Sequence, residues 1–355
     1  MRALRSGPCE RKWRMRRRVV LAGVCACALL GGGMPVRAAE AGPQVAACAT
    51  NPNVLGMSRL VEVDAAGGPL FGRVNNGGYD FLHDSEVVLT FDDGPLRAHT
   101  LAVLKALDAH CTKATFFMVG RMAVADPEMV QEVASRGHTV GAHTWSHAKL
   151  QGLAADKAKD EIELGFSAVA QALRGPIAPF FRFPYLRPSP AAMDYLKARD
   201  IASFTIDVDS RDFRTHDGDA VKRTVLAQLA GARKGILLFH DIQPSTAHAL
   251  AGILDELKQR GFKVVHLVPK QIATTLPEYD AQADRLIAQR KVITTKEPLA
   301  SRALTWPQAG SGSAGEVLPW THPAVTTGAN SQQTGSTTAS NKGPSVPWYK
   351  QWLMP

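Results

Sequence analysis

Two carboxylates stand side by side in the stretch L-T-F-D-D-G-P, where Asp92 and Asp93 directly follow an apolar run. Adjacent carboxylates repel each other and resist burial, so the pair needs an explanation. A solvated Asp-Gly-Pro turn that closes a strand is one explanation, because a turn in water tolerates two charges. A cation that binds one of the two carboxylates is the other.

Two histidines are spaced for metal binding in the stretch H-T-W-S-H, where His143 and His147 are four residues apart. This separation lets both imidazoles reach one metal ion from a turn or from the first turn of a helix. Taken alone, such a pair is more often structural. Together with a carboxylate from a neighbouring strand, it makes the three-residue ligand set of a catalytic zinc site, which leaves one position open for water.

A cation at this place would give the paired aspartates different roles. If Asp93 binds the ion, the positive charge makes the ionisation of Asp92 less costly. A bound metal ion lowers the pKa of water from about 15.7 to roughly 7, so that a neighbouring carboxylate can take its proton. The sequence therefore predicts Asp93 as a metal ligand and Asp92 as a general base.

Short β-rich runs alternate with helical stretches along the middle of the chain. The runs with strand composition are 86–91, 114–119, 138–143, 180–184, 202–208, 235–240 and 262–268. Helical patterns lie between most of them, for example at 100–109, 127–135, 156–173 and 246–260. Strands that alternate with helices form parallel sheets, so this pattern favours an α/β fold of the (β/α) barrel type. An open, doubly wound sheet is the alternative.

The polar residues with catalytic potential fall at the ends of these strands. In (β/α) barrels the carboxyl ends of the strands converge on one face, where the active site lies. Besides the residues named above, this face is expected to hold Arg182, Tyr185, Asp209, Asp212, His240 and Asp241. Nearly every candidate catalytic group is therefore predicted at one rim.

The motifs, taken in order, resemble those of the polysaccharide deacetylase family with a NodB homology domain, carbohydrate esterase family four. The resemblance is carried by T-F-D-D-G-P (90–95), H-T-W-S-H (143–147), R-F-P-Y (182–185), D-S-R-D-F (209–213) and L-F-H (238–240). The stretch K-A-T-F-F-M-V-G (113–120) fits the strand between the first two motifs. The resemblance covers roughly residues 83–275. It implies a distorted (β/α) barrel and the metal-dependent removal of an acetyl group from a sugar.

The resemblance also implies a role for each motif residue. Asp92 would be the general base, paired with Arg182, which holds it ionised and oriented. A divalent cation, expected to be zinc, would be held by Asp93, His143 and His147.

The remaining motif residues would stabilise the tetrahedral intermediate and assist its breakdown to products. The backbone N–H of Tyr185 would donate to its oxyanion, where one well-placed donor contributes about 3 kcal/mol. His240 would protonate the departing amine, and Asp212 would keep the imidazole charged and aimed. Leu238 would line the pocket for the acetyl methyl group, while Phe213 and Tyr185 would also contact the substrate.

Two positions depart from the family pattern. The family usually has Trp where this chain has Phe213, and Gly where it has Leu186. Phenylalanine keeps an apolar wall but fills less volume and donates no hydrogen bond, so a wider or repacked acetyl pocket is expected. Leu186 adds bulk beside the oxyanion loop and is expected to narrow or reshape the sugar groove.

The first 38 residues have the composition of a secretory signal peptide. They combine a basic start, an apolar run over residues 19–30 and a small-residue exit at Val36-Arg37-Ala38. An uncleaved anchor is the alternative, but the run is shorter than the ~20 residues that a spanning helix needs. We therefore expect export without a stable membrane anchor, to the periplasm, the cell envelope or the medium. Three arginines at 16–18 leave a twin-arginine route open.

The predicted signal peptide also accounts for most of the formal net charge of +9. It carries nine Lys or Arg residues against the single acid Glu10, so only one unit of positive charge remains in the rest of the chain. No stripe of basic and aromatic residues typical of nucleic-acid binding is found there, and no nucleic-acid partner is expected.

Removal of the signal peptide leaves two cysteines, Cys48 and Cys111. In an oxidising compartment they could form one disulfide. The alternative is a buried thiol at Cys111 and a free one at Cys48.

The predicted organisation is a signal peptide (1–38), an N-terminal leader (39–82), a deacetylase-like domain (83–275) and a C-terminal extension (276–355). Much of this extension consists of small and polar residues, which cannot build a core. Its aromatic residues include Trp306, Trp320, Trp348 and Trp352. They either dock back on the domain, or they serve in sugar stacking or in tethering to the cell wall.

Three functions are compatible with these observations. The first is an exported N-deacetylase that acts on an acetylated glycan built from N-acetylglucosamine, either peptidoglycan or a chitin-like oligosaccharide. The second is an O-deacetylase such as an acetylxylan esterase, because the same site can attack an ester. The third is a catalytically weak sugar-binding module, which would have no use for a base, a metal set and an acid together.

Overall fold

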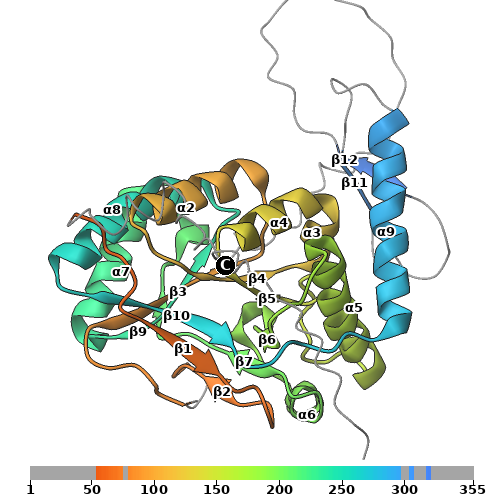
Figure 1. Cartoon of the computed structure of the whole chain (residues 1–355), viewed down its shortest axis with the longest axis horizontal. Coiled ribbons are helices and arrows are strands. Elements are labelled where there is room, and N and C mark those ends of the chain that lie inside the picture. Colours follow the sequence, from red (N-terminus) through yellow and green to blue (C-terminus); the bar gives the residue numbers. More distant parts are fainter. Residues whose placement is uncertain (1–52, 75–78, 297–303, 308–316, 321–355) are drawn as a thin grey trace, which may run out of the picture.

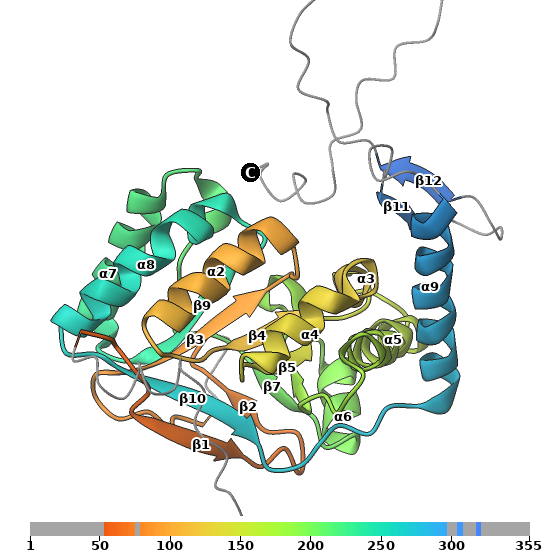
Figure 2. The same ribbon diagram turned by 45° about the horizontal axis from the view of Figure 1, so that its top comes forward.

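A parallel sheet that curls into a barrel, with helices along its outer side, forms the centre of the molecule (Figure 1, Figure 2). The computed structural model describes residues 53–74, 79–296, 304–307 and 317–320, with residues 291–296 and the last two ranges as backbone alone. Within these residues the main sheet has ten strands. The fold is therefore the α/β barrel that the sequence predicts, in a distorted form.

The strands of the barrel wall run parallel to one another. In order they are β9 (Gly235–His240), β3 (Glu86–Asp92), β4 (Thr115–Met118), β5 (Thr139–Ala142), β6 (Phe180–Phe181) and β7 (Ala202–Phe204). The β3–β9 pairing is the longest of these and extends from Val87 opposite Gly235 to Asp92 opposite His240. This register places Asp92 and His240 side by side at the carboxyl rim.

One bent segment, residues 202–209, closes the ring. Its first part is β7, which pairs with β6, and its last part is β8 (Val208–Asp209), which pairs with β9. Just before β8, the N–H of Asp207 donates to the carbonyl of Ile236. Two short strands thus replace one long strand, which makes the barrel irregular at this point.

Three further strands extend the sheet beyond the barrel wall. β2 (Leu70–Phe71) pairs with β7, while β10 (Lys263–Pro269) pairs with the start of β3 and with β1 (Arg59–Val63). The hydroxyl of Thr139, at the start of β5, donates to the carbonyl of Leu267 at 2.6 Å. This bond ties β10 to the amino-terminal end of the barrel.

Alternate strand residues contribute to two apolar cores. The cluster inside the barrel includes Phe117, Phe180, Phe204 and Ile236. The cluster between strands and helices includes Phe91, Phe116, Leu237 and Phe239. Complete burial of a phenylalanine contributes about 2 kcal/mol relative to its exposure, so these rings are a large part of what holds the sheet together.

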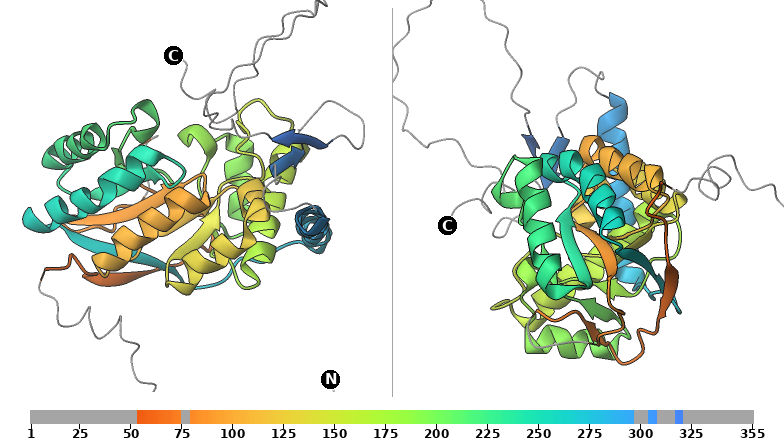
Figure 3. Two further views of the ribbon diagram at one scale, coloured as in Figure 1. Left: turned by 90° about the horizontal axis from the view of Figure 1, so that it is seen from above. Right: turned by 90° about the vertical axis from the view of Figure 1, so that its left-hand side faces the viewer.

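Helices follow most of the strands and lie along the outside of the barrel, as Figure 3 shows from two further directions. They are α2 (Arg97–Ala109), α3 (Gly120–Ala125), α4 (Pro127–Ser135), α5 (Ala155–Leu173), α6 (Pro190–Ala198), α7 (Gly218–Ala232) and α8 (Pro244–Gln259). Side chains of Asp126, Ser189 and Asp217 accept backbone N–H groups at the starts of α4, α6 and α7. Such caps fix where a helix begins.

A long helix, α9 (Pro277–Lys296), follows the barrel and packs against α5 (Figure 1). Ala283 is fully buried in a small cluster with Leu164 and Ala168 of α5, and the hydroxyl of Tyr279 donates to Oδ1 of Asp160 at 2.7 Å. Further along, β11 (Leu304–Pro307) and β12 (Val317–Trp320) form an antiparallel pair. The predicted docking of the tail tryptophans concerns side chains outside the described residues.

Most elements agree with the sequence analysis, since every predicted run contains a strand and the four predicted helical stretches are α2, α4, α5 and α8. The sequence analysis did not identify β1, β2, α3, α6, α7 or α9. β1 and β2 lie within the segment expected to be a leader, and both belong to the sheet. β1 has only partial burial, so its apolar alternation is weak.

The signal peptide and the leader up to residue 52 lie outside the described residues. None of the described helices is long and apolar enough to span a membrane. Cys111 is disulfide-bonded. Because it is the only cysteine in the described ranges, its partner lies outside them.

Candidate active site

The polar residues that the sequence analysis singles out lie together at the carboxyl rim of the barrel. Asp92 ends β3 and Asp93 follows it, His143 follows β5, Arg182 follows β6 and His240 ends β9. All five residues are at most 6% exposed. Burying so many ionisable groups is costly unless they are paired or bind an ion.

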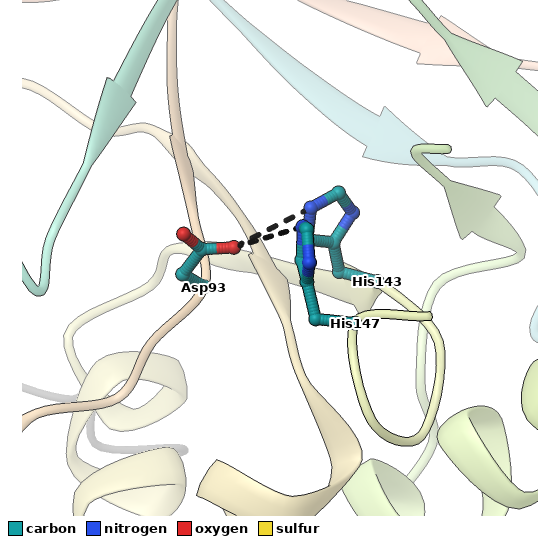
Figure 4. A group of neighbouring side chains, drawn as sticks. All are labelled: Asp93, His143 and His147. Carbon is teal, nitrogen blue, oxygen red and sulfur yellow. Dashed lines mark ion pairs between the residues drawn. The ribbon is translucent and has the colours of Figure 1, made fainter. Parts of the chain in front are cut away.

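Asp93, His143 and His147 form a compact group of candidate metal ligands (Figure 4). Oδ1 of Asp93 lies 3.5 Å from Nε2 of His143 and 3.6 Å from Nε2 of His147. These distances are too long for good hydrogen bonds. Ligand atoms about 2.1 Å from one tetrahedral ion lie about 3.4 Å apart, so these two separations suit side chains that share one divalent cation.

The backbone holds these side chains in position. Nδ1 of His143 lies 2.7 Å from the carbonyl of Arg182, so Nδ1–H donates and Nε2 keeps its lone pair for a metal. Asp93 and His147 have left-handed backbones, with φ of 76° and 61°. This conformation costs a non-glycine residue about 1 kcal/mol or more and persists only where the surroundings enforce it.

Burial also sets the protonation states of the group. It lowers the pKa of His143 to about 4 and that of His147 well below its ordinary value, so both imidazoles are neutral. Burial raises the pKa of Asp93 to about 7, and neighbouring carboxylates add to the rise against the opposing charge of His240. Oδ1 of Asp93 has no hydrogen-bond partner among the described residues. Two neutral imidazoles and a carboxylate that lacks a hydrogen bond fit a divalent cation.

Asp92 and Arg182 form a buried ion pair beside this group. Nη1 of Arg182 donates to Oδ1 of Asp92 and to Oγ1 of Thr90, at 2.7 Å in both cases. The guanidinium also lies 4.3 Å from the ring centre of Phe117. Oδ2 of Asp92 is 3.8 Å from Nε2 of His143, so its second oxygen faces the candidate metal ligands.

His240 and Asp212 form a second buried pair across the rim. Asp212 begins the short 3₁₀ helix η2 (Asp212–Arg214), and its Oδ1 lies 2.7 Å from Nδ1 of His240. Its Oδ2 accepts the backbone N–H of His240 at 2.7 Å and also the hydroxyl of Thr246. Burial alone would lower the pKa of His240, but the carboxylates around it, Asp212 above all, raise it to about 10. His240 is therefore protonated at neutral pH, and Nδ1–H donates to Asp212.

The predicted substrate-contacting residues surround these groups. Tyr185, on the 3₁₀ helix η1 (Pro184–Leu186), is 46% exposed, and its ring centre lies 4.8 Å from that of His147. The ring of Phe213 meets that of His240 edge to face, with centres 5.7 Å apart. Leu238 is buried two residues before His240, so strand alternation places both on the inner face of β9.

Two aspartates from the predicted rim make other contacts. Oδ1 of Asp209 accepts the backbone N–H of Arg211 and stabilises the turn before η2. Oδ2 of Asp241 accepts the hydroxyl of Thr100 at 2.5 Å, next to the turn that follows Asp93. Neither contact joins these carboxylates to the candidate metal ligands or to the two ion pairs.

Three polar contacts at the site were not found by sequence reasoning. Thr90 lies two residues before Asp92, and the period of two could have indicated that both face the barrel interior. Thr246 lies at the start of α8, where no motif marked it. Glu161, in the middle of α5, accepts hydrogen bonds from Ser146 between the two histidines, and no local signal connects residues so far apart in the sequence.

Known proteins are similar to this chain. A family model described as polysaccharide deacetylase matches residues 82–203, which include the first three motifs. Peptidoglycan-N-acetylglucosamine deacetylase PgdA of Listeria monocytogenes serotype 1/2a (strain 10403S) is 32% identical over 186 residues, which are 51% of this chain and 38% of that protein. The chain thus spans well under half the length of that relative.

Two other matches cover more of the proteins concerned. A chitooligosaccharide deacetylase of Bradyrhizobium sp. (strain ANU 289) is 30% identical over 217 residues, covering 57% of this chain and 97% of that protein. Among solved structures, the Bdellovibrio bacteriovorus peptidoglycan deacetylase Bd3279 has a TM-score of 0.56 and 34% identity, covering 62% of this chain and 61% of that one. Since the similarity extends over nearly the whole of one relative, and the barrel carries the expected residues at its rim, the chain belongs to the polysaccharide deacetylase family.

Proposed function

We propose that this protein is an exported, metal-dependent deacetylase that hydrolyses the N-acetyl groups of glycans containing N-acetylglucosamine. The observation that carries the proposal is the assembly of three buried groups at one rim. These groups are the Asp93–His143–His147 ligand set, the Asp92–Arg182 pair and the His240–Asp212 pair. A structural role alone does not require a ligand set, a carboxylate and a protonated histidine to face one another.

Asp92 is the general base in this proposal. Arg182 occupies its Oδ1, which leaves Oδ2 on the side of His143 to take a proton from the attacking water. A divalent cation held by Asp93, His143 and His147, which we propose is zinc, would polarise the acetyl carbonyl and acidify water. Water adds to the carbonyl carbon as its proton passes to Asp92.

His240 is the general acid and Tyr185 provides an oxyanion donor. The backbone N–H of Tyr185 stabilises the negative oxygen of the tetrahedral intermediate. The imidazolium of His240 donates its Nε2 proton to the sugar nitrogen while Nδ1–H remains bonded to Asp212. The carbon–nitrogen bond then breaks, and acetate and the free amine leave. Leu238 and Phe213 line the space for the acetyl group.

The names of the relatives support a glycan substrate. Those reported above are named as deacetylases of peptidoglycan and of chitooligosaccharide. We propose that the acetylated glycan of this protein belongs to the same class, peptidoglycan or a chitin-like oligosaccharide. Such a polymer lies outside the cytoplasm, which agrees with cleavage of residues 1–38 as a signal peptide and with action in the periplasm, in the cell envelope or outside the cell.

We also propose the division of the chain into a leader (39–82), a catalytic domain (83–275) and a C-terminal extension (276–355). The described strands β1 and β2 and the helix α9 pack on the barrel from both flanking segments. Limited proteolysis followed by mass spectrometry tests the boundaries. Cleavage within the barrel before any cleavage in the flanks would contradict them.

Acetate release tests the proposed activity. Purified protein with zinc or with a chelator is given chitin oligomers, peptidoglycan and acetylated xylan in parallel, and the variant Asp92→Asn is the control. Asparagine keeps an acceptor for Arg182 but cannot take a proton, so this variant is expected to bind zinc and release no acetate. Chelator-sensitive release from an amide-linked substrate is the expected result.

Other outcomes would redirect the proposal. Release from acetylated xylan alone would identify an O-deacetylase. Folded, zinc-loaded protein that releases nothing from any of the three substrates would exclude deacetylation of these glycans and favour the sugar-binding module.

A further inference from the structure

Both candidate histidine ligands belong to one irregular loop, residues 143–147, which we call the histidine loop. It connects β5 to the segment before α5 and contains two residues with left-handed backbones, Thr144 and His147. A loop of this kind does not fix its own conformation, because it lacks the repeating hydrogen bonds of a helix or a sheet. Contacts from outside the loop must therefore hold the two imidazoles 3.5 and 3.6 Å from Oδ1 of Asp93.

Glu161 of α5 makes three hydrogen bonds to the middle of this loop. Its carboxylate Oε2 accepts the backbone N–H of Ser146 at 2.8 Å, and its Oε1 accepts the hydroxyl of the same residue at 2.7 Å. Its backbone carbonyl accepts the N–H of Trp145 at 2.7 Å. One helical residue thus binds two consecutive loop residues that lie between the histidines.

The opposite side of the loop is bound by α3. The N–H groups of Gly120 and Arg121 donate to the carbonyls of Thr144 and Trp145, at 2.9 and 3.0 Å. The side chain of Trp145 packs against the cluster that α5 and α9 share. The histidine loop is therefore held between two helices, and the carboxylate of Glu161 binds its centre at Ser146.

We propose that Glu161 is a positioning residue for the metal site: it fixes the histidine loop so that His147 stays within reach of the ion bound by Asp93 and His143. The proposal rests on the metal site of the proposed function. Hydrogen bonds to a carboxylate are about twice as strong as neutral ones, which suits a bond that must hold a strained loop. Direct hydrogen-bond partners of metal ligands typically change metal affinity about 10- to 100-fold when they are removed, and we take this range for Glu161, which binds the residue next to His147.

Zinc affinity of the metal-free protein tests the proposal, measured by competition with a chromophoric chelator. Glu161→Ala removes both side-chain bonds and is expected to weaken zinc binding by about 10- to 100-fold. Glu161→Gln keeps the length of the side chain, and its amide can still accept the N–H of Ser146 and donate to its hydroxyl oxygen. This conservative variant is expected to recover most of the affinity.

Asp160→Ala is the matched control. Asp160 precedes Glu161 on the same helix, but its carboxylate bonds to Tyr279 of α9 and to Lys157, not to the loop. Its removal is expected to lower the melting temperature and to leave zinc affinity unchanged. A purely structural role for Glu161 would give that same pattern, so the comparison separates positioning from stability.

Ser146→Ala provides a second test in case the Glu161 variant does not fold. It removes one hydrogen bond between the loop and Glu161 and leaves the helix unchanged. It is expected to weaken zinc binding by a smaller factor than Glu161→Ala. Wild-type affinity in both the alanine variant of Glu161 and that of Ser146 would overturn the proposal. If the wild-type protein itself binds no zinc, the metal site of the proposed function fails first, and the role of Glu161 fails with it.

Discussion

Nη1 of Arg182 lies 2.7 Å from Oδ1 of Asp92, and neither side chain has more than 3% of its surface exposed. The same guanidinium donates to the carbonyls of Phe204 and Thr205, at 3.3 Å each. A planar group with five donors can satisfy several acceptors at fixed angles, which a lysine ammonium cannot do. Arg182 is thus both the partner of the proposed base and a connection between three strands.

Arg182→Lys is expected to damage stability and activity together. Lysine keeps the charge but loses several of these hydrogen bonds, so the free energy of unfolding should fall by about 3 kcal/mol, at the lower end of the cost of breaking a buried ion pair. Loss of orientation at Asp92 should lower kcat/KM by about 100-fold or more. Urea unfolding and acetate release measure the two effects. Arg223→Lys, at an exposed ion pair with Asp217, should change neither.

Asp212→Asn is expected to shift the pH profile of the reaction. Asp212 helps to raise the pKa of His240 to about 10, so removing its charge lowers that pKa. The acid is active while protonated, so activity is lost as the pH rises through its pKa. The alkaline limb of kcat/KM should therefore move to lower pH in the variant, with a loss of roughly 10- to 100-fold near pH 7. An unmoved alkaline limb would mean that another group is the acid.

The protein is expected to lose free energy of unfolding in acid because two histidines far from the rim, His138 and His266, are buried. Burial, with the charge of Lys113 adding to it, lowers the pKa of His138 to about 3 and that of His266 to about 4. In the unfolded chain both titrate near 6.5, so below that pH the unfolded state binds protons that the folded state does not. Their contribution to stability is complete above pH 6.5 and falls toward pH 4 by about 1.4 kcal/mol per pH unit for each.

The variant His266→Gln isolates one of these two contributions. Urea unfolding between pH 7 and pH 4 should show a shallower decline than in the wild type, by about 1.4 kcal/mol per pH unit. Glutamine can replace the contact between Nε2 of His266 and Oγ1 of Thr139, which is 3.0 Å long. His216→Gln, at an exposed position, should leave the decline unchanged. Equal slopes in all three proteins would contradict the assignment.

Gly94→Ala is expected to disturb the turn that carries Asp93. A Cβ at this position would lie 2.2 and 2.3 Å from the two carboxylate oxygens of Asp241, so one of the two must move. Overpacking of this kind costs about 1–3 kcal/mol, and displacement of Asp93 should weaken zinc binding. The double variant with Asp241→Ala should be less destabilised than the sum of the single variants, because the obstructing carboxylate is gone. Strictly additive unfolding free energies would show that the two positions do not meet.

The strands and the rim residues were predictable because each signal was local. Runs such as 86–91 combine apolar and β-branched residues, and their polar ends share one edge once the strands are parallel. Asp92 and His240 could therefore be placed near each other without knowledge of the register that makes them neighbours. In the same way, the spacing of His143 and His147 indicated a shared ion once a carboxylate from a neighbouring strand end was expected beside them.

The supporting contacts were not predictable because they depend on tertiary structure. Glu161 lies on a helix whose sequence shows only an amphipathic pattern, and its orientation toward Ser146 depends on how α5 packs on the barrel. β1 and β2 are short or partly exposed, and only pairing with β10 and β7 makes them strands. The division of 202–209 into two strands follows from barrel closure, which no local pattern encodes.

The orientation of Asp92, the proposed base, depends on the closing segment, residues 202–209, through Arg182. The carbonyls that hold Arg182 belong to Phe204 and Thr205, and the segment that contains them is completed only when β8 pairs with β9, about thirty residues later in the chain. In a nascent or partly opened chain the ring is incomplete. The guanidinium of Arg182 is then not held in place, and the carboxylate of Asp92 is not oriented. Hydrolytic competence should therefore appear in one step with ring closure, and recovery of activity during refolding would report on the pairing of β8 with β9.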